Sequence, residues 1–178
     1  MDLKEKYEKK VRPALMKKYS LSSPLAVPRI SKVVVNTGIG RVREEKDQEI
    51  ISRQLALITG QKPSARPARK SIASFKTRQG MTLGYKVTLR GKRMYDFLSR
   101  LLNVALPRTR DFGGLEETSV DERGNLTIGI REQIVFPEMS GEDLKNIFGL
   151  EVSIVTDSKN REIALQMYKL LGVPLKLK

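Results

Sequence analysis

Residues 84–91, with the sequence GYKVTLRG, alternate apolar and polar side chains, and this period of two most constrains the fold of the chain. Successive side chains of a β-strand point to opposite faces of its sheet, so the segment is predicted to be a half-buried strand. One face carries Tyr85, Val87 and Leu89, and the other carries Lys86, Thr88 and Arg90. If helices cover the apolar face, the polar face stays open to a partner.

Other segments carry their own signals for strands and helices. Strands are predicted over residues 29–40, 125–136 and 150–156, where β-branched or alternating residues dominate. Helices are predicted where apolar residues recur at helical spacing, over residues 47–59, 92–106 and 158–172. We expect Gly60 and Gly172 to cap two of these helices and Pro107 to stop the third.

Two further helical segments have less regular signals. Residues 3–19 place an apolar residue at every fourth position, and Pro13 is expected to kink this helix or to split it in two. A short helix is expected to begin at Ser140, with Asp143 in a capping box, and to end at Gly149.

Strands and helices interleave without an internal repeat, and the length of 178 residues suits a single domain over residues 1–178. We divide it into an N-terminal part, 24–80, with the first strand, a helix and a basic loop, and a C-terminal part, 84–177. The expected fold class is α+β: a mostly antiparallel sheet with helices packed on one face, an open basic polar face and a long basic loop.

The charge is large and uneven. The chain has 34 basic and 20 acidic residues, a formal net charge of +14. Residues 50–95 contain eleven basic residues and no acid, whereas residues 116–178 contain eleven acids and eight bases. A solvated face normally mixes both signs, so the acid-free stretch indicates a polyanionic partner such as a nucleic acid.

Several function classes lose support from the composition. The absence of Cys and His removes thiol and imidazole catalysis and Cys/His metal sites, so we expect no enzyme, no metal and no cofactor. A glycine pattern near Gly38 resembles a dinucleotide-binding turn but has Arg43 at its third glycine position. Acidic residues near Asp121 are expected to form a solvated loop. The sequence has no apolar run of about 18 residues and no apolar signal-peptide core, so we expect a cytosolic protein without a membrane or a small-molecule substrate.

The basic loop, residues 68–80, concentrates four cations around one aromatic ring. Arg69, Lys70, Lys76 and Arg78 can neutralise phosphates, and Ser71, Ser74 and Thr77 can hydrogen-bond phosphates or sugars. Phe75 can stack on an exposed base, or it can tuck into the protein and anchor the loop. Gly80 and Gly84 are expected to make the exit of the loop pliable, and an RNA partner is expected to order it.

The polar faces of two predicted strands offer a second contact surface. Lys32, Val34 and Asn36 share a face of the strand over 29–40, and Lys86, Thr88 and Arg90 share a face of the strand over 84–91. Lys can supply charge to phosphates, and Asn and Thr can supply directional hydrogen bonds to sugars and bases. The alternative is two ordinary solvent faces.

Residues 70–115, KSIASFKTRQGMTLGYKVTLRGKRMYDFLSRLLNVALPRTRDFGGL, closely resemble the bacterial large-subunit ribosomal protein number five family. VPRISKVVVNTGIG, LALITGQKP and GIREQIVFPE resemble the same family, so the similarity covers nearly the whole chain. The resemblance implies a structural ribosomal protein that binds 5S rRNA in the central protuberance, contacts peptidyl-site tRNA and bridges to small-subunit ribosomal protein thirteen. Other large-subunit proteins associated with 5S rRNA are further implied partners.

The resemblance also implies roles for individual residues. The resemblance implies that Lys32, Asn36, Gln61 and Thr88 lie on the 5S rRNA surface. Lys86 and Arg90, which share the strand face of Thr88, and Lys62 complete the predicted surface. The implied tRNA-facing loop comprises Arg69, Lys70, Ser71, Phe75, Lys76 and Arg78. The implied bridge comprises Arg108, Arg110, Asp111 and Phe112, with the segment after Phe136. The chain departs from the family at Gly113, where the family usually has Arg, and at Glu122, where it has Gly.

Two other functions remain open at this point. An RNA-binding regulator or chaperone acting outside ribosomes would have the same charge pattern but would not co-sediment with large subunits. An enzyme acting on nucleic acid or a nucleotide would need a catalytic carboxylate, and no paired-carboxylate motif is present.

Overall fold

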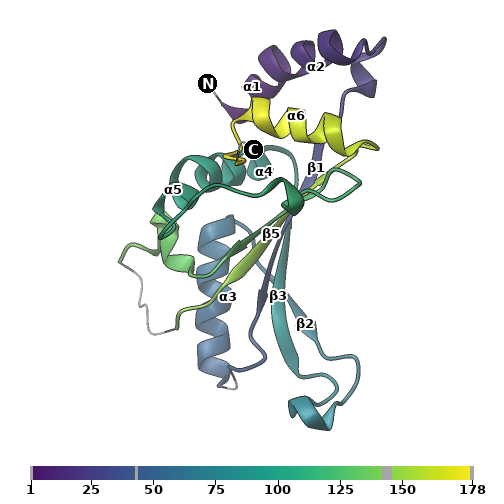
Figure 1. Ribbon diagram of the computed structural model, residues 1–178. Helices are drawn as coiled ribbons and strands as arrows, with labels where there is room; N and C mark the ends of the chain where they lie inside the picture. Colours follow the sequence, from purple (N-terminus) through teal and green to yellow (C-terminus); the bar gives the residue numbers. More distant parts are fainter. Residues whose placement is uncertain (1, 43, 142–145, 177–178) are drawn as a thin grey trace.

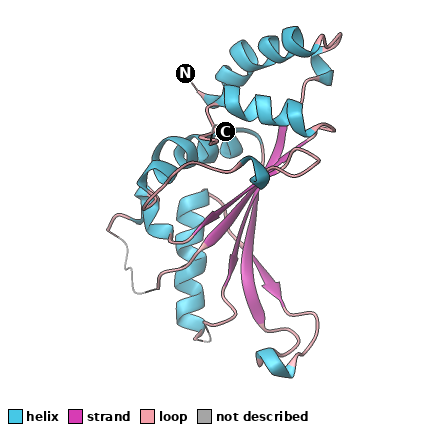
Figure 2. Cartoon of the chain, viewed as in Figure 1, coloured by secondary structure: helices cyan, strands magenta, loops and turns pink. Residues whose placement is uncertain are grey.

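The computed structural model describes residues 2–42, 44–141 and 146–176. Five strands form one antiparallel sheet in the order β2-β3-β1-β5-β4. The strands are β1 (Ile30–Gly38), β2 (Ser64–Pro67), β3 (Thr82–Leu89), β4 (Leu126–Ile130) and β5 (Leu150–Thr156). Figure 2 shows them as one twisted layer whose β2 and β3 strands extend away from the helices.

The helices gather on one face and at one end of this sheet (Figure 1). They are α1 (Leu3–Lys6), α2 (Arg12–Tyr19), α3 (Glu45–Thr59), α4 (Gly91–Arg100), α5 (Leu106–Arg108) and α6 (Arg161–Leu171). Helix α3 contacts β3, and helix α4 contacts β1. Helix α2 packs on α6 at the end of the sheet away from the β2–β3 hairpin. The α+β fold with helices on one face is therefore confirmed.

The register of the central strands explains which face the helices cover. Val33 and Val35 of β1 lie opposite Leu89 and Val87 of β3, and all four side chains are buried. On β5 the buried partners of the same two valines are Ile154 and Val152. The alternation predicted for β3 is confirmed, because its apolar positions enter the core and its polar positions do not.

The N-terminal helix does not end at Pro13: it runs on from Leu3 to Tyr19, and its irregularity is a π turn that comes before the proline. A π-helical turn over Tyr7–Val11 joins α1 to α2, and the N–H of Arg12 donates to the carbonyl of Tyr7. In an α-helix every fourth residue drifts by about 40° around the axis. The wider π turn corrects this drift, so the apolar residues at every fourth position, Leu3, Tyr7, Val11 and Leu15, are all buried.

The prediction that Pro107 stops its helix is wrong. A π-helical turn over Leu101–Ala105 precedes it, and the helix continues through Pro107 to Arg108. The N–H of Leu106 donates to the carbonyl of Leu101, five residues earlier. Proline is normally excluded because it lacks an N–H and presses on the carbonyl four residues before it. The π pattern relieves this conflict, since that carbonyl no longer needs an N–H four residues on.

Three other predictions of secondary structure need correction. Residues 64–67, for which no strand was predicted, form the edge strand β2. The strand predicted over 125–136 ends at Ile130, because the side chain of Gln133 turns inward, accepts from Phe148 N at 2.9 Å and donates to Asn146 O at 2.8 Å. Residues 146–149 are not helical, and Asp143 lies outside the described residues.

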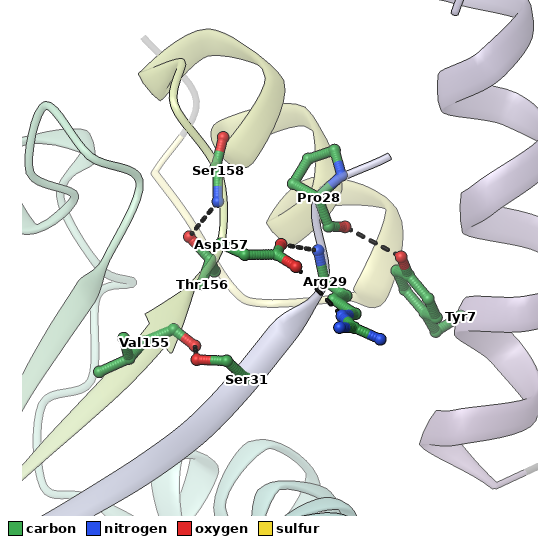
Figure 3. A network of polar contacts seen from close by, with 8 residues as sticks. All are labelled: Tyr7, Pro28, Arg29, Ser31, Val155, Thr156, Asp157 and Ser158. Atoms are coloured by element: carbon green, nitrogen blue, oxygen red, sulfur yellow. Dashed lines mark hydrogen bonds and ion pairs between the residues drawn. The ribbon is translucent and has the colours of Figure 1, made fainter. Parts of the chain in front are cut away.

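Hydrogen bonds tie the N-terminal helical segment to the residues before β1, and tie the beginning of β1 to the end of β5 (Figure 3). The hydroxyl of Tyr7 donates to Pro28 O at 2.9 Å. Asp157, which follows β5, accepts from the backbone N of Arg29 at 2.7 Å and from its Nε at 3.1 Å. Ser31 Oγ donates to Val155 O at 3.1 Å. This network fixes the strand end from which the polar face of the sheet begins.

Candidate nucleic-acid interface

The face of the sheet away from the helices carries the polar residues predicted on β1 and β3. In the register of these strands Asn36 lies opposite Lys86, and Val34 lies opposite Thr88. Lys32, Lys86 and Thr88 are half-buried and Asn36 is exposed. The sheet thus brings together side chains that are about fifty residues apart in the sequence.

Gln61 joins this surface through a contact that strand periodicity did not reveal. Its Nε2 donates to the backbone oxygen of Thr88 at 3.3 Å. Thr59 Oγ1 donates to Gln61 O at 3.1 Å and so holds the turn after α3 in place. Lys62 is exposed on the same turn, and Arg90 is exposed directly after β3, where it precedes α4. We call these seven residues the polar sheet face: Lys32, Asn36, Gln61, Lys62, Lys86, Thr88 and Arg90.

Strand β2 extends the polar sheet face with residues that sequence reasoning missed. Ser64 lies opposite Lys86, and Arg66 lies opposite Gly84. Both side chains are exposed, as are all four residues of β2. The segment has no apolar alternation because neither of its faces is buried, so only its pairing with β3 makes it a strand.

The basic loop is the tip of the β2–β3 hairpin, and backbone hydrogen bonds hold it together. Ala68 N donates to Met81 O at 2.8 Å, and Gly80 N donates to Ala68 O at 3.0 Å. Nearer the tip, Ile72 and Thr77 exchange backbone bonds of 3.1 and 3.2 Å. The expectation of a pliable exit is wrong at Gly84, which lies within β3 against the backbone of β1.

Two hydroxyls of the loop also form hydrogen bonds within the hairpin. Ser71 Oγ accepts from Gln79 N at 2.9 Å, across the neck of the loop. Thr77 Oγ1 donates to Ile72 O at 3.4 Å. The tip therefore has internal hydrogen bonds of its own, and its ordering by an RNA partner stays a prediction.

The tip presents an apolar ring among unpaired cations. Phe75 is 75% exposed, so the alternative in which it anchors the loop in the protein is wrong. Lys76 has a positive φ of 51°, which turns the chain directly after the ring. Arg69, Lys70, Lys76 and Arg78 are exposed, and none of them forms an ion pair within the part of the chain that the structure describes.

The residues of the implied bridge line a hollow of about 600 Å³ beside the end of β4, whose Gly129, Ile130 and the following Arg131 also belong to the lining. Arg110, Asp111 and Phe112 belong to its lining, and Arg108 ends α5 nearby. Arg110 Nε and Asp111 Oδ2 are 3.9 Å apart and almost fully exposed. A Cβ added at Gly113 would meet only the Lys176 side chain, at 3.8 Å, so the departure from Arg at this position leaves the hollow more open.

The acidic loop is held by its own hydrogen bonds. Asp121 accepts from the backbone N and the Nδ2 of Asn125, both at 2.8 Å. Burial acts to raise the pKa of Asp121, but these hydrogen bonds outweigh it and lower the pKa. Glu122 is exposed. The described residues contain no group of three or more potential metal ligands, and none of their helices has the length and apolarity of a membrane span.

Two family models match the chain. The model described as Ribosomal protein L5 matches residues 23–78, and the model for the C-terminus of the same ribosomal protein family matches residues 82–175. The division into parts over 24–80 and 84–177 stays a prediction.

Bacterial relatives are similar over nearly their full length. The large ribosomal subunit protein uL5 of Dictyoglomus turgidum is 51% identical, with 98% of both chains covered. The proteins of the same name from Chloroflexus aurantiacus and Rubrobacter xylanophilus are 52% and 46% identical, with 98% of this chain and 97% of each relative covered.

The open basic sheet and the full-length similarity define a ribosomal protein with no enzymatic activity. Within that class, the chain belongs to the ribosomal protein L5 family. The resemblance first seen in the sequence is therefore confirmed.

Proposed function

We propose that the chain is a structural constituent of the bacterial large ribosomal subunit that binds 5S rRNA through the polar sheet face. Its relatives are named as large-subunit proteins, which supports a place on the ribosome in the cytoplasm. The observation that carries the proposal is the open sheet: Lys32, Asn36, Lys86 and Thr88 lie together on the side that no helix covers. Lysines can contact phosphates there, and the amide and hydroxyl groups can contact sugars and bases.

The hairpin tip would then serve a second RNA. We propose that Phe75 and its surrounding cations reach peptidyl-site tRNA, because the tip projects well beyond the sheet (Figure 1). The exposed ring supports stacking on a base, and the unpaired cations support phosphate contacts. Ser71 contributes by holding the neck of the hairpin.

The hollow beside Arg110, Asp111 and Phe112 is the proposed contact with small-subunit ribosomal protein thirteen. Arg108 and Arg131 add positive charge near it, and Phe112 adds an apolar side chain. Other large-subunit proteins that accompany 5S rRNA complete the proposed set of partners.

Binding of 5S rRNA across a salt series, with excess bulk tRNA as competitor, tests the proposal. The logarithm of affinity should fall with the logarithm of salt concentration by roughly 0.7–0.9 per phosphate contacted, and binding should survive the competitor. Thr88→Val and Asn36→Ala should each weaken binding by roughly 1–3 kcal/mol through the loss of a directional contact. Unchanged affinity in both variants would remove the polar sheet face as the site.

A further inference from the structure

An open hollow of about 430 Å³ lies at the end of the polar sheet face, next to Asn36. It is a shallow depression that is widely open to solvent. Strands β1, β5 and β4 form it side by side, since Asn36 lies opposite Glu151 and Glu151 lies opposite Gly129. Gly38, Gly149 and Arg131 also line the hollow.

Two of its glycines have no packing reason to lack a side chain. A Cβ added at Gly38 or Gly129 would meet nothing within 4 Å, and neither residue has a positive φ. Glycine inside a strand weakens it and often marks the close approach of a ligand or of another backbone. Gly129 also lines the hollow beside Arg110 and Phe112, so the space above it is open and can admit a ligand.

Glu151 is unexpected on a surface that binds a polyanion. It is the one acidic residue within the five strands, and it is exposed beside Asn36. No cation of the described residues forms an ion pair with it, and its hydrogen-bond partner is Ser153 Oγ, at 3.5 Å. A carboxylate repels phosphates and accepts hydrogen bonds without donating any. It can favour RNA binding by accepting hydrogen bonds, from a ribose 2′-hydroxyl or, with both oxygens at once, from adjacent donors on a base.

We propose that this hollow receives an unstacked guanine of the RNA bound on the polar sheet face. Glu151 accepts from the N1–H and the exocyclic amino group of the base, since guanine presents two adjacent donors on its Watson–Crick edge and a carboxylate presents two acceptors. Single-stranded RNA is recognised through such edges. The bare backbone at Gly38 and Gly129 leaves room for the ring, while Asn36 and Arg131 at the rim can donate to its acceptors. The assignment rests on the proposed function and adds base specificity to it.

Glu151→Gln separates this role from simple repulsion of phosphates, because the two roles predict opposite changes in the affinity for 5S rRNA. Loss of a repelling charge alone would strengthen binding of any RNA. Loss of the guanine contact should weaken binding of 5S rRNA about 10-fold while leaving binding of bulk tRNA unchanged or stronger. Glu162→Gln, an exposed acid on α6, is the matched control and should not weaken 5S rRNA binding. Stronger 5S rRNA binding by Glu151→Gln would overturn the proposal.

Filling the hollow gives a test that does not depend on charge. Gly129→Val adds a side chain where nothing lies within 4 Å, so the melting temperature should be unchanged or higher while 5S rRNA affinity falls about 10-fold. Gly40→Val is the control, because Gly40 lies outside the hollow and its Cβ would make only an ordinary contact, with Leu83 Cδ2 at 3.8 Å. Wild-type affinity in Gly129→Val would contradict the assignment.

Inosine, which lacks the exocyclic amino group, identifies the base. We would replace guanosine by inosine in the single-stranded loops of 5S rRNA, one loop at a time. One replacement should weaken binding of the wild-type chain, and Glu151→Gln should no longer distinguish the two RNAs. If no replacement weakens binding, the guanine assignment is refuted and the proposed function stands. If wild-type binding of 5S rRNA is lost to bulk tRNA, the proposed function is refuted together with this inference.

Discussion

At the scale of single residues, Gly84 and Gly38 show how unequal two glycines in the same sheet can be. They lie opposite each other on β3 and β1. A Cβ on Gly84 would lie 2.5 Å from Thr37 O, a backbone atom that cannot rotate away. A Cβ on Gly38 would meet nothing within 4 Å. Gly84 therefore permits the close approach of β1 and β3, whereas Gly38 only leaves space on the open face.

We predict that Gly84→Ala destabilises the protein by about 1–3 kcal/mol, because β1 and β3 must move apart. Gly38→Ala should leave the free energy of unfolding unchanged or slightly raise it, since alanine restricts the unfolded chain more than glycine does. Urea denaturation followed by circular dichroism measures both. Equal unfolding midpoints for the two variants would show that the sheet absorbs the clash at Gly84.

At the scale of elements, the β2–β3 hairpin carries its charge away from the rest of the molecule. Its backbone bonds and the Ser71–Gln79 contact order it, so the four cations at its tip can be changed without disturbing the core. The polar sheet face lies on the strands, and the tip lies beyond them (Figure 1). The two surfaces should therefore be separable by mutation.

We predict that replacing Arg69, Lys70, Lys76 and Arg78 together by Gln weakens tRNA-dependent function but retains specific 5S rRNA binding. On the proposed function the tip contacts a second RNA, so the salt dependence of 5S rRNA binding should stay close to that of the wild type. Filter binding of 5S rRNA and peptidyl-site tRNA occupancy on reconstituted subunits measure the two effects. Collapse of 5S rRNA binding would mean that the tip had been assigned to the wrong RNA.

At the scale of the whole molecule, hydrogen bonds connect the N-terminal helical segment to the chain before β1 and to α6. Tyr7 donates to Pro28 O at 2.9 Å, and Lys6 Nζ donates to Leu171 O at 2.7 Å at the end of α6. The buried hydroxyl of Tyr7 belongs to the network of Figure 3, and its acceptor Pro28 lies shortly before β1 in the sequence. Burial raises the pKa of Tyr7, so its hydroxyl remains a donor at neutral pH.

We predict that Tyr7→Phe lowers the free energy of unfolding by about 0.5–1.5 kcal/mol, since Pro28 O loses its donor. Tyr19→Phe is the control, because no hydrogen bond of the Tyr19 hydroxyl is found within the described residues. Binding of 5S rRNA below the melting temperature should be unchanged in both variants, as neither residue lies on the polar sheet face. A stability loss of the same size in Tyr19→Phe would attribute the effect to packing.

The sequence by itself determined the two faces of β1 and β3, because a period of two leaves only one way to bury Val33, Val35, Val87 and Leu89. It also determined the charge of the hairpin tip, since charge does not depend on folding. The tertiary structure decided the rest of the candidate site. Strand β2 has no buried face, so only its pairing with β3 defines it. Gln61 reaches Thr88 only through the turn after α3. The hollow at Glu151 exists only because three strands that are distant in the sequence lie side by side.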